Sequence, residues 1–215
     1  MQVAIPIFPR LTALDAIGPY EVLQRIPSID VTFVGERRGE VRTENGFLGL
    51  SVDATFDEVP APDVVVVPGG VGTRVLLDRD NPIVAWVRAA HPGTRFTTSV
   101  CSGSLVLAAA GLLDGLTATT HWGGAMTALG GLGGAVPVTQ RVVEHLPERI
   151  ITAAGVSSGI DMAIRLVELL VDDVAAQAAQ TYIEYDPQPP FPAGHPSKVG
   201  PEVMARIAEY TAVRS

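Results

Sequence analysis

The chain has 215 residues, of which 47% are hydrophobic, and a net charge of −8 from 15 Lys and Arg against 23 Asp and Glu. This length and apolar fraction predict one folded α/β domain over residues 1–215, with a core that needs no metal or disulfide. An acidic chain without a basic stripe is a poor candidate for binding nucleic acid or an anionic membrane. The first residues do not resemble a signal peptide, and the longest apolar run, residues 105–113, is too short to span a membrane. Together with a single cysteine, these features favour the cytoplasm.

Strand and helix patterns alternate along the chain. Strands are predicted at residues 3–8, 30–35, 63–67, 95–100, 117–121, 136–144 and 149–153, with a hairpin around Asn45-Gly46. Helices are predicted at residues 15–23, from 74, at 82–90, 102–110, from about 123, and at 157–171, 174–184 and 201–213. Pro6 suits only a sheet edge or a bulge, and the Pro-rich segment 186–196 favours an extended strap. Such alternation with short Gly and Pro turns predicts a mostly parallel sheet with helices on both faces.

The only cysteine, Cys101, lies where an apolar, β-branched run ends and a helix begins. A strand, a one-residue corner and a helix start form the layout of a nucleophile elbow, with Cys in place of Ser. Gly103 removes a Cβ where the helix and the strand must pack closely. Free N–H groups at the helix start favour a thiolate, which predicts a reactive thiol that is ionised near neutral pH. A buried structural cysteine is the alternative.

Three further candidates follow strands that end at the same edge of the predicted sheet, where ligands bind in such folds. Asp15 is either a general acid–base group or a helix N-cap. Gly69 and Gly70 either turn N–H groups toward an anion or form a tight turn. Ser102 offers a hydroxyl and an N–H beside Cys101, or caps the following helix.

Histidines offer a second possible partner for the thiol. His121 ends a predicted strand on the same edge and is either a partner of Cys101 or a structural histidine. His91, His145 and His195 lie in polar or Pro-rich contexts and are expected on the surface. No histidine pair has metal-ligand spacing and there is no second cysteine, so a metal site is not expected.

Four segments together resemble the DJ-1/PfpI superfamily, along essentially the whole chain. They are Pro68-Gly69-Gly70, Val100-Cys101-Ser102-Gly103-Ser104, Ala118-Thr119-Thr120-His121-Trp122 and Pro189-Pro190-Phe191-Pro192-Ala193-Gly194. Within the superfamily, residues 14–19, 105–113 and 155–161 are most similar to bacterial isocyanide hydratases. The resemblance implies a flavodoxin-like, doubly wound core, a homodimer, and addition of water to an isocyanide to give an N-formamide without a cofactor.

The resemblance also implies roles for individual residues. The nucleophile falls on Cys101, which would form a covalent thioimidate, and the general acid–base group falls on Asp15. Ser102 aligns with a threonine of the isocyanide hydratases, and Ala153-Ala154 stands where a more glycine-rich turn is expected. The residues that would bind the substrate or its developing negative charge are Gly69, Gly70, His121, Gly155 and Val156.

Two other functions remain open at this stage. Similar modules form part of transcription regulators, but the chain carries no basic helical tail after Val213. Other superfamily members are stress-response proteins whose cysteine senses oxidants or processes aldehydes. Turnover of an isocyanide would favour the hydratase, and loss of methylglyoxal would favour the aldehyde-processing alternative.

Overall fold

The computed structural model describes residues 1–214 and is organised around a seven-stranded sheet of order β10-β11-β7-β6-β1-β2-β5. The strands are β1 (Gln2–Pro6), β2 (Asp30–Gly35), β5 (Ala54–Thr55), β6 (Val64–Val67), β7 (Phe96–Val100), β10 (Val142–His145) and β11 (Ile150–Ala153). All neighbours are parallel except β10 and β11. The mostly parallel, doubly wound sheet that the sequence predicts is confirmed.

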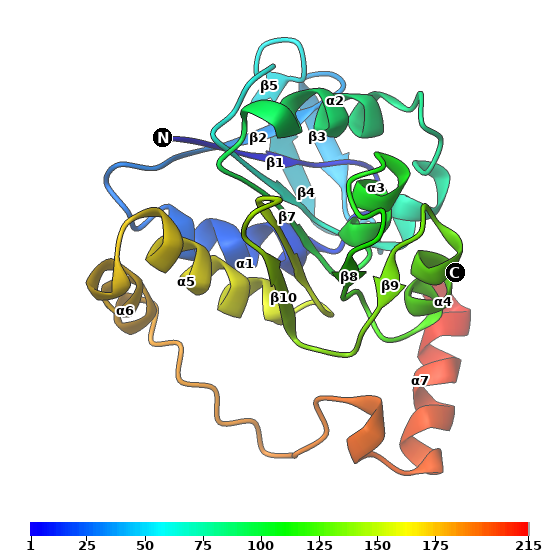
Figure 1. Ribbon diagram of the computed structural model, residues 1–215. Coiled ribbons are helices and arrows are strands. Elements are labelled where there is room, and N and C mark those ends of the chain that lie inside the picture. The colour runs from blue at the N-terminus through cyan, green and yellow to red at the C-terminus, as the bar shows by residue number, and fades with distance from the viewer. Residues whose placement is uncertain (215) are drawn as a thin grey trace.

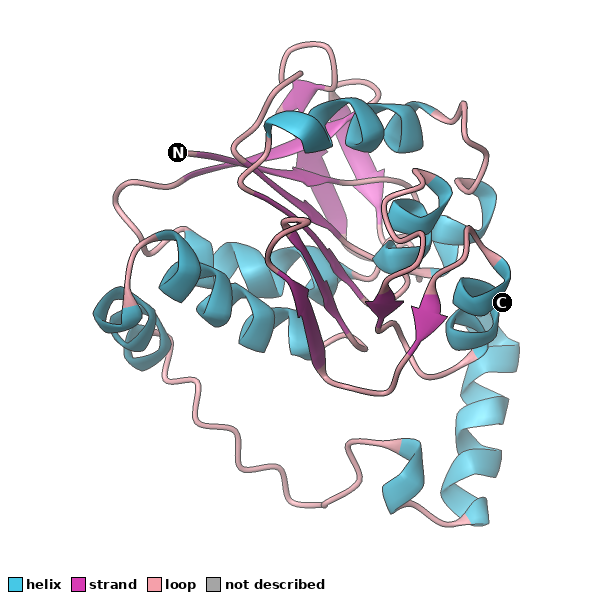
Figure 2. Ribbon diagram, in the orientation of Figure 1, coloured by secondary structure: helices cyan, strands magenta, loops and turns pink. Residues whose placement is uncertain are grey.

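Helices cover both faces of this sheet (Figure 1, Figure 2). One face carries α1 (Ala13–Leu23), α5 (Ser158–Leu170) and α6 (Asp173–Tyr182). The other carries α2 (Pro82–Ala90) and α3 (Gly103–Ala109), and α4 (Gly124–Gly131) packs against α3. Shorter elements are the antiparallel pair β3 (Gly39–Arg42) and β4 (Gly49–Val52), the parallel pair β8 (Thr117–Ala118) and β9 (Val136–Pro137), and the 3-10 turns η1 (Val71–Val75), η2 (His91–Gly93) and η3 (Pro196–Lys198). None of the helices within residues 1–214 combines the length and the apolar character needed to cross a membrane.

The centre of the sheet is built by the valine run of β6. All four of its side chains are fully buried, because β6 pairs with β1 on one side and β7 on the other while helices cover both faces. Burial of each valine contributes about 2 kcal/mol. This rigid centre fixes the ends of β1, β6 and β7, from which the candidate site residues project.

Several element boundaries differ from those predicted. The expected helix from Arg74 is only the turn η1, because Thr73 and Leu76 make i to i−3 hydrogen bonds that close a 3-10 turn. The expected strand at 136–144 divides between β9 and β10, which belong to different sheets. The prediction that Pro6 lies at a sheet edge or a bulge is wrong: Pro6 ends the interior strand β1, beyond the residues that pair with β6.

The chain after α6 leaves the body of the protein as an extended strap, as expected from its prolines. Residues 186–194 are all exposed, and Tyr185 anchors the start of the strap by donating a 2.7 Å hydrogen bond from its hydroxyl to Asp161. The strap leads to η3 and then to α7 (Pro201–Arg214), which lies apart from the sheet (Figure 1).

Candidate functional site

Cys101 is the corner residue between β7 and α3, and its backbone is strained. Its φ of 57° lies in the left-handed region, which is unfavourable for a residue with a side chain. Four hydrogen bonds hold this conformation. The Cys101 N–H lies 3.1 Å from the Ala153 oxygen and 2.8 Å from the Ala154 oxygen, and its carbonyl accepts from the hydroxyls of Thr120 (2.9 Å) and Ser104 (3.2 Å). The nucleophile-elbow geometry expected from the sequence is therefore present.

Gly103 allows this corner to sit tightly on the sheet. A Cβ at this position would lie 2.1 Å from the carbonyl oxygen of Val67, at the end of β6. No side chain fits in that space, so the start of α3 and the end of β6 approach each other only because residue 103 is glycine. The role expected for Gly103 is confirmed.

Asp15 lies in the first turn of α1 and is fully buried. The N-cap of α1 is Thr12, so the alternative of Asp15 as the N-cap is wrong. Its Oδ2 accepts a 2.9 Å hydrogen bond from the N–H of Gly69, and its carboxylate also interacts with the Cys101 thiol. Within the described part of the chain, Oδ1 is buried without a conventional hydrogen-bond partner.

Burial changes the acidity of both members of this pair. It raises the pKa of Asp15 to about 7, although the hydrogen bond from Gly69 and the interaction with Cys101 act in the opposite direction. Burial and the adjacent Asp15 charge also raise the pKa of the Cys101 thiol, while the N–H and hydroxyl of Ser102 lower it. The expectation of a readily ionised thiol is therefore wrong beside an ionised Asp15. Two adjacent charges in this space disfavour each other, so the pair titrates as a coupled unit.

Ser102 and the two glycines join the elbow to the loop after β6. The Ser102 hydroxyl accepts from the N–H of Gly70 at 2.9 Å and from the Thr73 hydroxyl at 3.1 Å. It does not cap α3. A Cβ on Gly69 would lie 2.5 Å from the Ser102 nitrogen, which explains the glycine. The N–H groups of Gly69 and Gly70 are thus directed at Asp15 and Ser102, and neither glycine lines the cavity described next.

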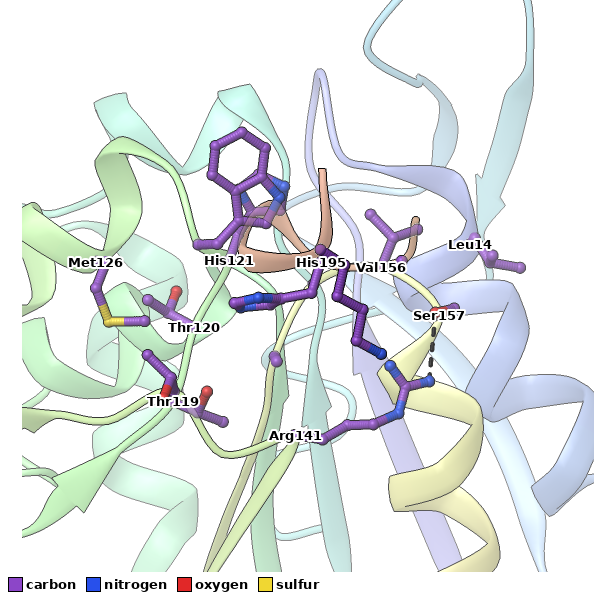
Figure 3. Close-up of a pocket in the computed structure, with 15 residues that line it drawn as sticks. Leu14, Thr119, Thr120, His121, Met126, Arg141, Val156, Ser157 and His195 are labelled. Atoms are coloured by element: carbon purple, nitrogen blue, oxygen red, sulfur yellow. Dashed lines mark hydrogen bonds between the residues drawn. The ribbon is translucent and has the colours of Figure 1, made fainter. Parts of the chain in front are cut away.

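A cavity of about 510 Å³ adjoins the elbow (Figure 3). It shares Thr120 and Ala154 with the hydrogen bonds that hold Cys101, and it includes Leu14, which precedes Asp15. Cys101 itself is only 5% exposed and lies outside the lining. Of the predicted site residues, His121, Gly155 and Val156 line the cavity. The other lining residues are Thr119, Trp122, Met126, Thr139, Arg141, Ser157, Gly194, His195 and Lys198.

His121 is a neutral wall residue of this cavity. Its Nδ1 accepts a 3.2 Å hydrogen bond from the N–H of Gly123, which leaves the proton on Nε2. Burial lowers the pKa of His121, so the ring is uncharged at neutral pH. The side chains that interact with the Cys101 thiol are those of Asp15 and Ser102, which disfavours the alternative of a Cys–His pair.

The structure adds residues for which no role was predicted from the sequence. Thr120 and Thr73 hold the elbow and Ser102, although Thr120 lies in a segment that carries the family resemblance. His195, expected on the surface, lines the cavity together with Arg141 and Lys198. No short-range pattern brings these three residues together, because they come from the approach to β10 and from the strap. Among residues 1–214, no group of three or more His, Cys, Asp or Glu side chains could hold a metal ion.

Comparisons with known proteins agree with this geometry. The family model described as the DJ-1/PfpI family matches residues 1–169. The isonitrile hydratase of Pseudomonas putida is 39% identical over 219 residues, which cover 100% of this chain and 93% of that protein. The crystal structure of a THiJ/PfpI family protein from Pseudomonas syringae superposes with a TM-score of 0.90 at 35% identity, covering 99% of this chain and 86% of that one.

A shorter match involves the HTH-type transcriptional regulator GbdR of Pseudomonas aeruginosa, strain UCBPP-PA14. It is 41% identical over 75 residues, which cover 35% of this chain and 20% of the regulator. This match leaves most of the regulator without a counterpart. Because the family model covers more than half of the chain and the Pseudomonas putida relative aligns along its whole length, the chain belongs to the DJ-1/PfpI family.

Proposed function

We propose that this protein adds water to an isocyanide, also called an isonitrile, and releases an N-substituted formamide. The observation that carries the proposal is the buried pair of Cys101 and Asp15, which lies beside a cavity and in which burial raises the pKa of Asp15 to about 7. The full-length similarity to an isonitrile hydratase supports it. The chemistry needs a nucleophile and a group that both gives and takes a proton near neutral pH.

The first step joins the thiol to the substrate. The Cys101 sulfur, as a thiolate, attacks the isocyanide carbon, and a C–S bond forms. Asp15 gives its proton to the same carbon, which yields a thioimidate and leaves Asp15 ionised. This step requires Asp15 to be protonated. Protonation also removes the negative charge of Asp15, which otherwise raises the pKa of the thiol. Thiolate and carboxylic acid are thus formed together by moving one proton within the pair.

The second step uses the same carboxylate as a base. Asp15 takes a proton from water as the oxygen bonds to the thioimidate carbon, and the proton passes to the nitrogen. The hydroxyl proton then returns to Asp15 as the C–S bond breaks. The formamide leaves, and both the thiolate and the protonated Asp15 are restored. Atoms and charge balance over the cycle, so no cofactor is required.

The test is turnover of a neutral isocyanide, such as benzyl isocyanide, with chromatographic detection of N-benzylformamide. Cys101→Ala should retain the fold and lose all turnover, because the sequence contains no second thiol. Asp15→Asn should lose about 10²- to 10⁴-fold in kcat, as is typical when a general acid–base group is removed. Acid quenching during turnover should trap an adduct of the whole isocyanide on Cys101, detectable by mass spectrometry.

Methylglyoxal serves as the comparison substrate. Its consumption without isocyanide turnover would contradict the proposal and support the aldehyde-processing alternative. Retained hydration by Cys101→Ala would exclude the covalent route. A near-normal rate for Asp15→Asn would remove Asp15 from the mechanism.

A further inference from the structure

The polar groups that line the cavity are unusual for so acidic a chain. The protein has a net charge of −8, yet no described residue of the lining is Asp or Glu. The lining instead contains Arg141, Lys198, His121 and His195. The cavity is therefore a local region of hydrogen-bond donors and positive charge on a negatively charged molecule.

Lys198 is the only lysine in the sequence, and it belongs to this lining. Its backbone N–H is bonded to His195, which fixes the turn η3. Within the described part of the chain, its ammonium group has no carboxylate partner; the seven ion pairs there are all made by arginines. A cation without a counter-ion at a cavity is a natural contact for a ligand anion.

Arg141 also lines the cavity but is already neutralised. It forms an ion pair with Asp161 and donates a 3.3 Å hydrogen bond to the Ser157 hydroxyl, as Figure 3 shows. The other Asp161 oxygen accepts the 2.7 Å hydrogen bond from Tyr185 at the start of the strap. Arg141 and Ser157 lie across the view in Figure 3 from Met126 and Thr120, and Thr120 is the residue whose hydroxyl bonds to the Cys101 carbonyl.

The two histidines of the lining add ring N–H donors. The His195 Nδ1 accepts from the N–H of Ser197 at 3.2 Å and contacts its hydroxyl at 2.7 Å, which leaves Nε2 as the N–H donor. His121 has the same tautomer, because Gly123 occupies its Nδ1. The ring N–H groups of two histidines thus accompany Lys198 and Arg141 in the lining.

We infer that this cavity selects isocyanides that carry a carboxylate, which Lys198 binds as an anion while the isocyanide carbon is directed to Cys101. The inference rests on the proposed function for the isocyanide group, and on the cavity lining for the carboxylate. Carboxylates accept charge-assisted hydrogen bonds from ammonium and imidazole donors, which a neutral ester cannot match. The cavity of about 510 Å³ has room for a short chain between the two groups.

The kinetic test compares 4-isocyanobutanoate with its methyl ester, which has nearly the same shape and no charge. The wild-type protein should prefer the carboxylate in kcat/KM. Lys198→Gln should lose about fivefold for the carboxylate, mainly through KM, and leave the ester unchanged, since an ion pair at an exposed lysine is modest in strength. Lys198→Arg should restore the preference. Arg37→Gln removes the same charge at an exposed turn outside the cavity and should change neither substrate.

A second test needs no turnover. Reductive methylation can modify only Lys198 and the N-terminal amine, because no other lysine exists. The product analogue 4-formamidobutanoate should protect Lys198 from methylation, whereas its methyl ester should not. The amine of Met1, which donates to the Ser28 oxygen, should react equally in all samples and serves as the internal control.

The two tests separate failure of the inference from failure of the proposed function. Equal kcat/KM values of the wild type and Lys198→Gln for the carboxylate, with no protection of Lys198, would overturn the inference while hydration remains. Absence of hydration with both substrates would contradict the proposed function, and protection of Lys198 would still support the carboxylate subsite. Protection by the ester as well as by the carboxylate would contradict recognition of charge.

Discussion

Asp15 and Cys101 occupy a space in which charge is poorly solvated, and this has a measurable cost for Asp15. Its pKa in the folded protein is about 7, above the ordinary value of 3.8. The folded state therefore holds the Asp15 proton over a pH range in which the unfolded state has lost it. By linkage, the ionised side chain destabilises the fold as pH rises from about 4 to about 7, and the cost is constant above that.

The corresponding prediction concerns Asp15→Asn, which cannot ionise. Relative to wild type, this variant should gain stability as pH rises, by a few kcal/mol between about pH 4.5 and about pH 8. Urea unfolding at both pH values measures the difference. A stability difference that is the same at the two pH values would show that Asp15 is not desolvated in the way its burial indicates.

A second prediction at this scale concerns the thiol. The Asp15 charge raises the pKa of Cys101, so Asp15→Asn should lower that pKa and increase the thiolate fraction at a given pH. Iodoacetamide should then label Cys101 faster in Asp15→Asn than in wild type at about pH 8, where Asp15 is ionised. Because Cys101 is the only cysteine, total label reports this site alone. The exposed Asp173→Asn is the matched control, and slower labelling of Asp15→Asn would contradict the prediction.

At the scale of elements, the approach of α3 to β6 depends on one missing Cβ. Gly103→Ala would place a methyl group 2.1 Å from the Val67 oxygen, so the elbow must shift. We expect a loss of at least about 2 kcal/mol in unfolding free energy, as for other overpacked sites, and a slower reaction of Cys101 with iodoacetamide. Denaturant unfolding and labelling rates measure the two effects.

Gly124→Ala provides the control for that variant. Gly124 is also helical, but a Cβ there meets no atom within 4 Å. Its replacement should be neutral or should stabilise the protein by up to about 1 kcal/mol, since alanine favours the helix. Equal effects of the two substitutions on the unfolding free energy would show that the close approach of α3 to β6 does not require glycine at position 103.

The elements that were predicted well are those fixed by local physical chemistry. A run of four valines has no polar face and must be a buried strand, and Asn81-Pro82 marks a helix start whose side-chain cap is present. The boundaries that were predicted wrongly lie where pairing with distant strands determines where an element begins and ends. The division of residues 136–144 between two sheets depends on β8 and β11, which no local pattern specifies.

Only the part of the candidate site that depends on the sheet topology could be predicted from the sequence. Parallel strands bring Asp15, Gly69 and Cys101 to one edge of the sheet, and this followed from chain order alone. The hydrogen bond between Gly70 and Ser102 and the burial that raises the pKa of Asp15 depend on the three-dimensional packing, which chain order does not specify. The place of Lys198 in the cavity wall could not be predicted, because it depends on the path of the extended strap that precedes η3, and such a strap has no periodicity.

At the scale of the whole molecule, we predict a homodimer. The family resemblance suggests it, and large apolar side chains such as Phe47 and Val75 are 88% and 81% exposed, respectively. Sedimentation equilibrium at micromolar concentration should give twice the chain mass of 22.5 kDa. A stable dimer of this kind would bury about 2,000 Å² or more. A species of single-chain mass under these conditions would refute the prediction.

The strap that leads to η3 and Lys198 separates two properties of the protein that often depend on the same residues in enzymes, namely reactivity and choice of substrate. The reactive pair is held by β7, α1 and α3. Part of the cavity wall is instead contributed by residues at the end of, and directly after, the nine consecutive exposed residues 186–194. Substitutions in that wall can alter which molecules are accepted without displacing the atoms that make and break bonds. Natural variation and laboratory selection therefore have a route to new substrates that does not first pass through an inactive protein.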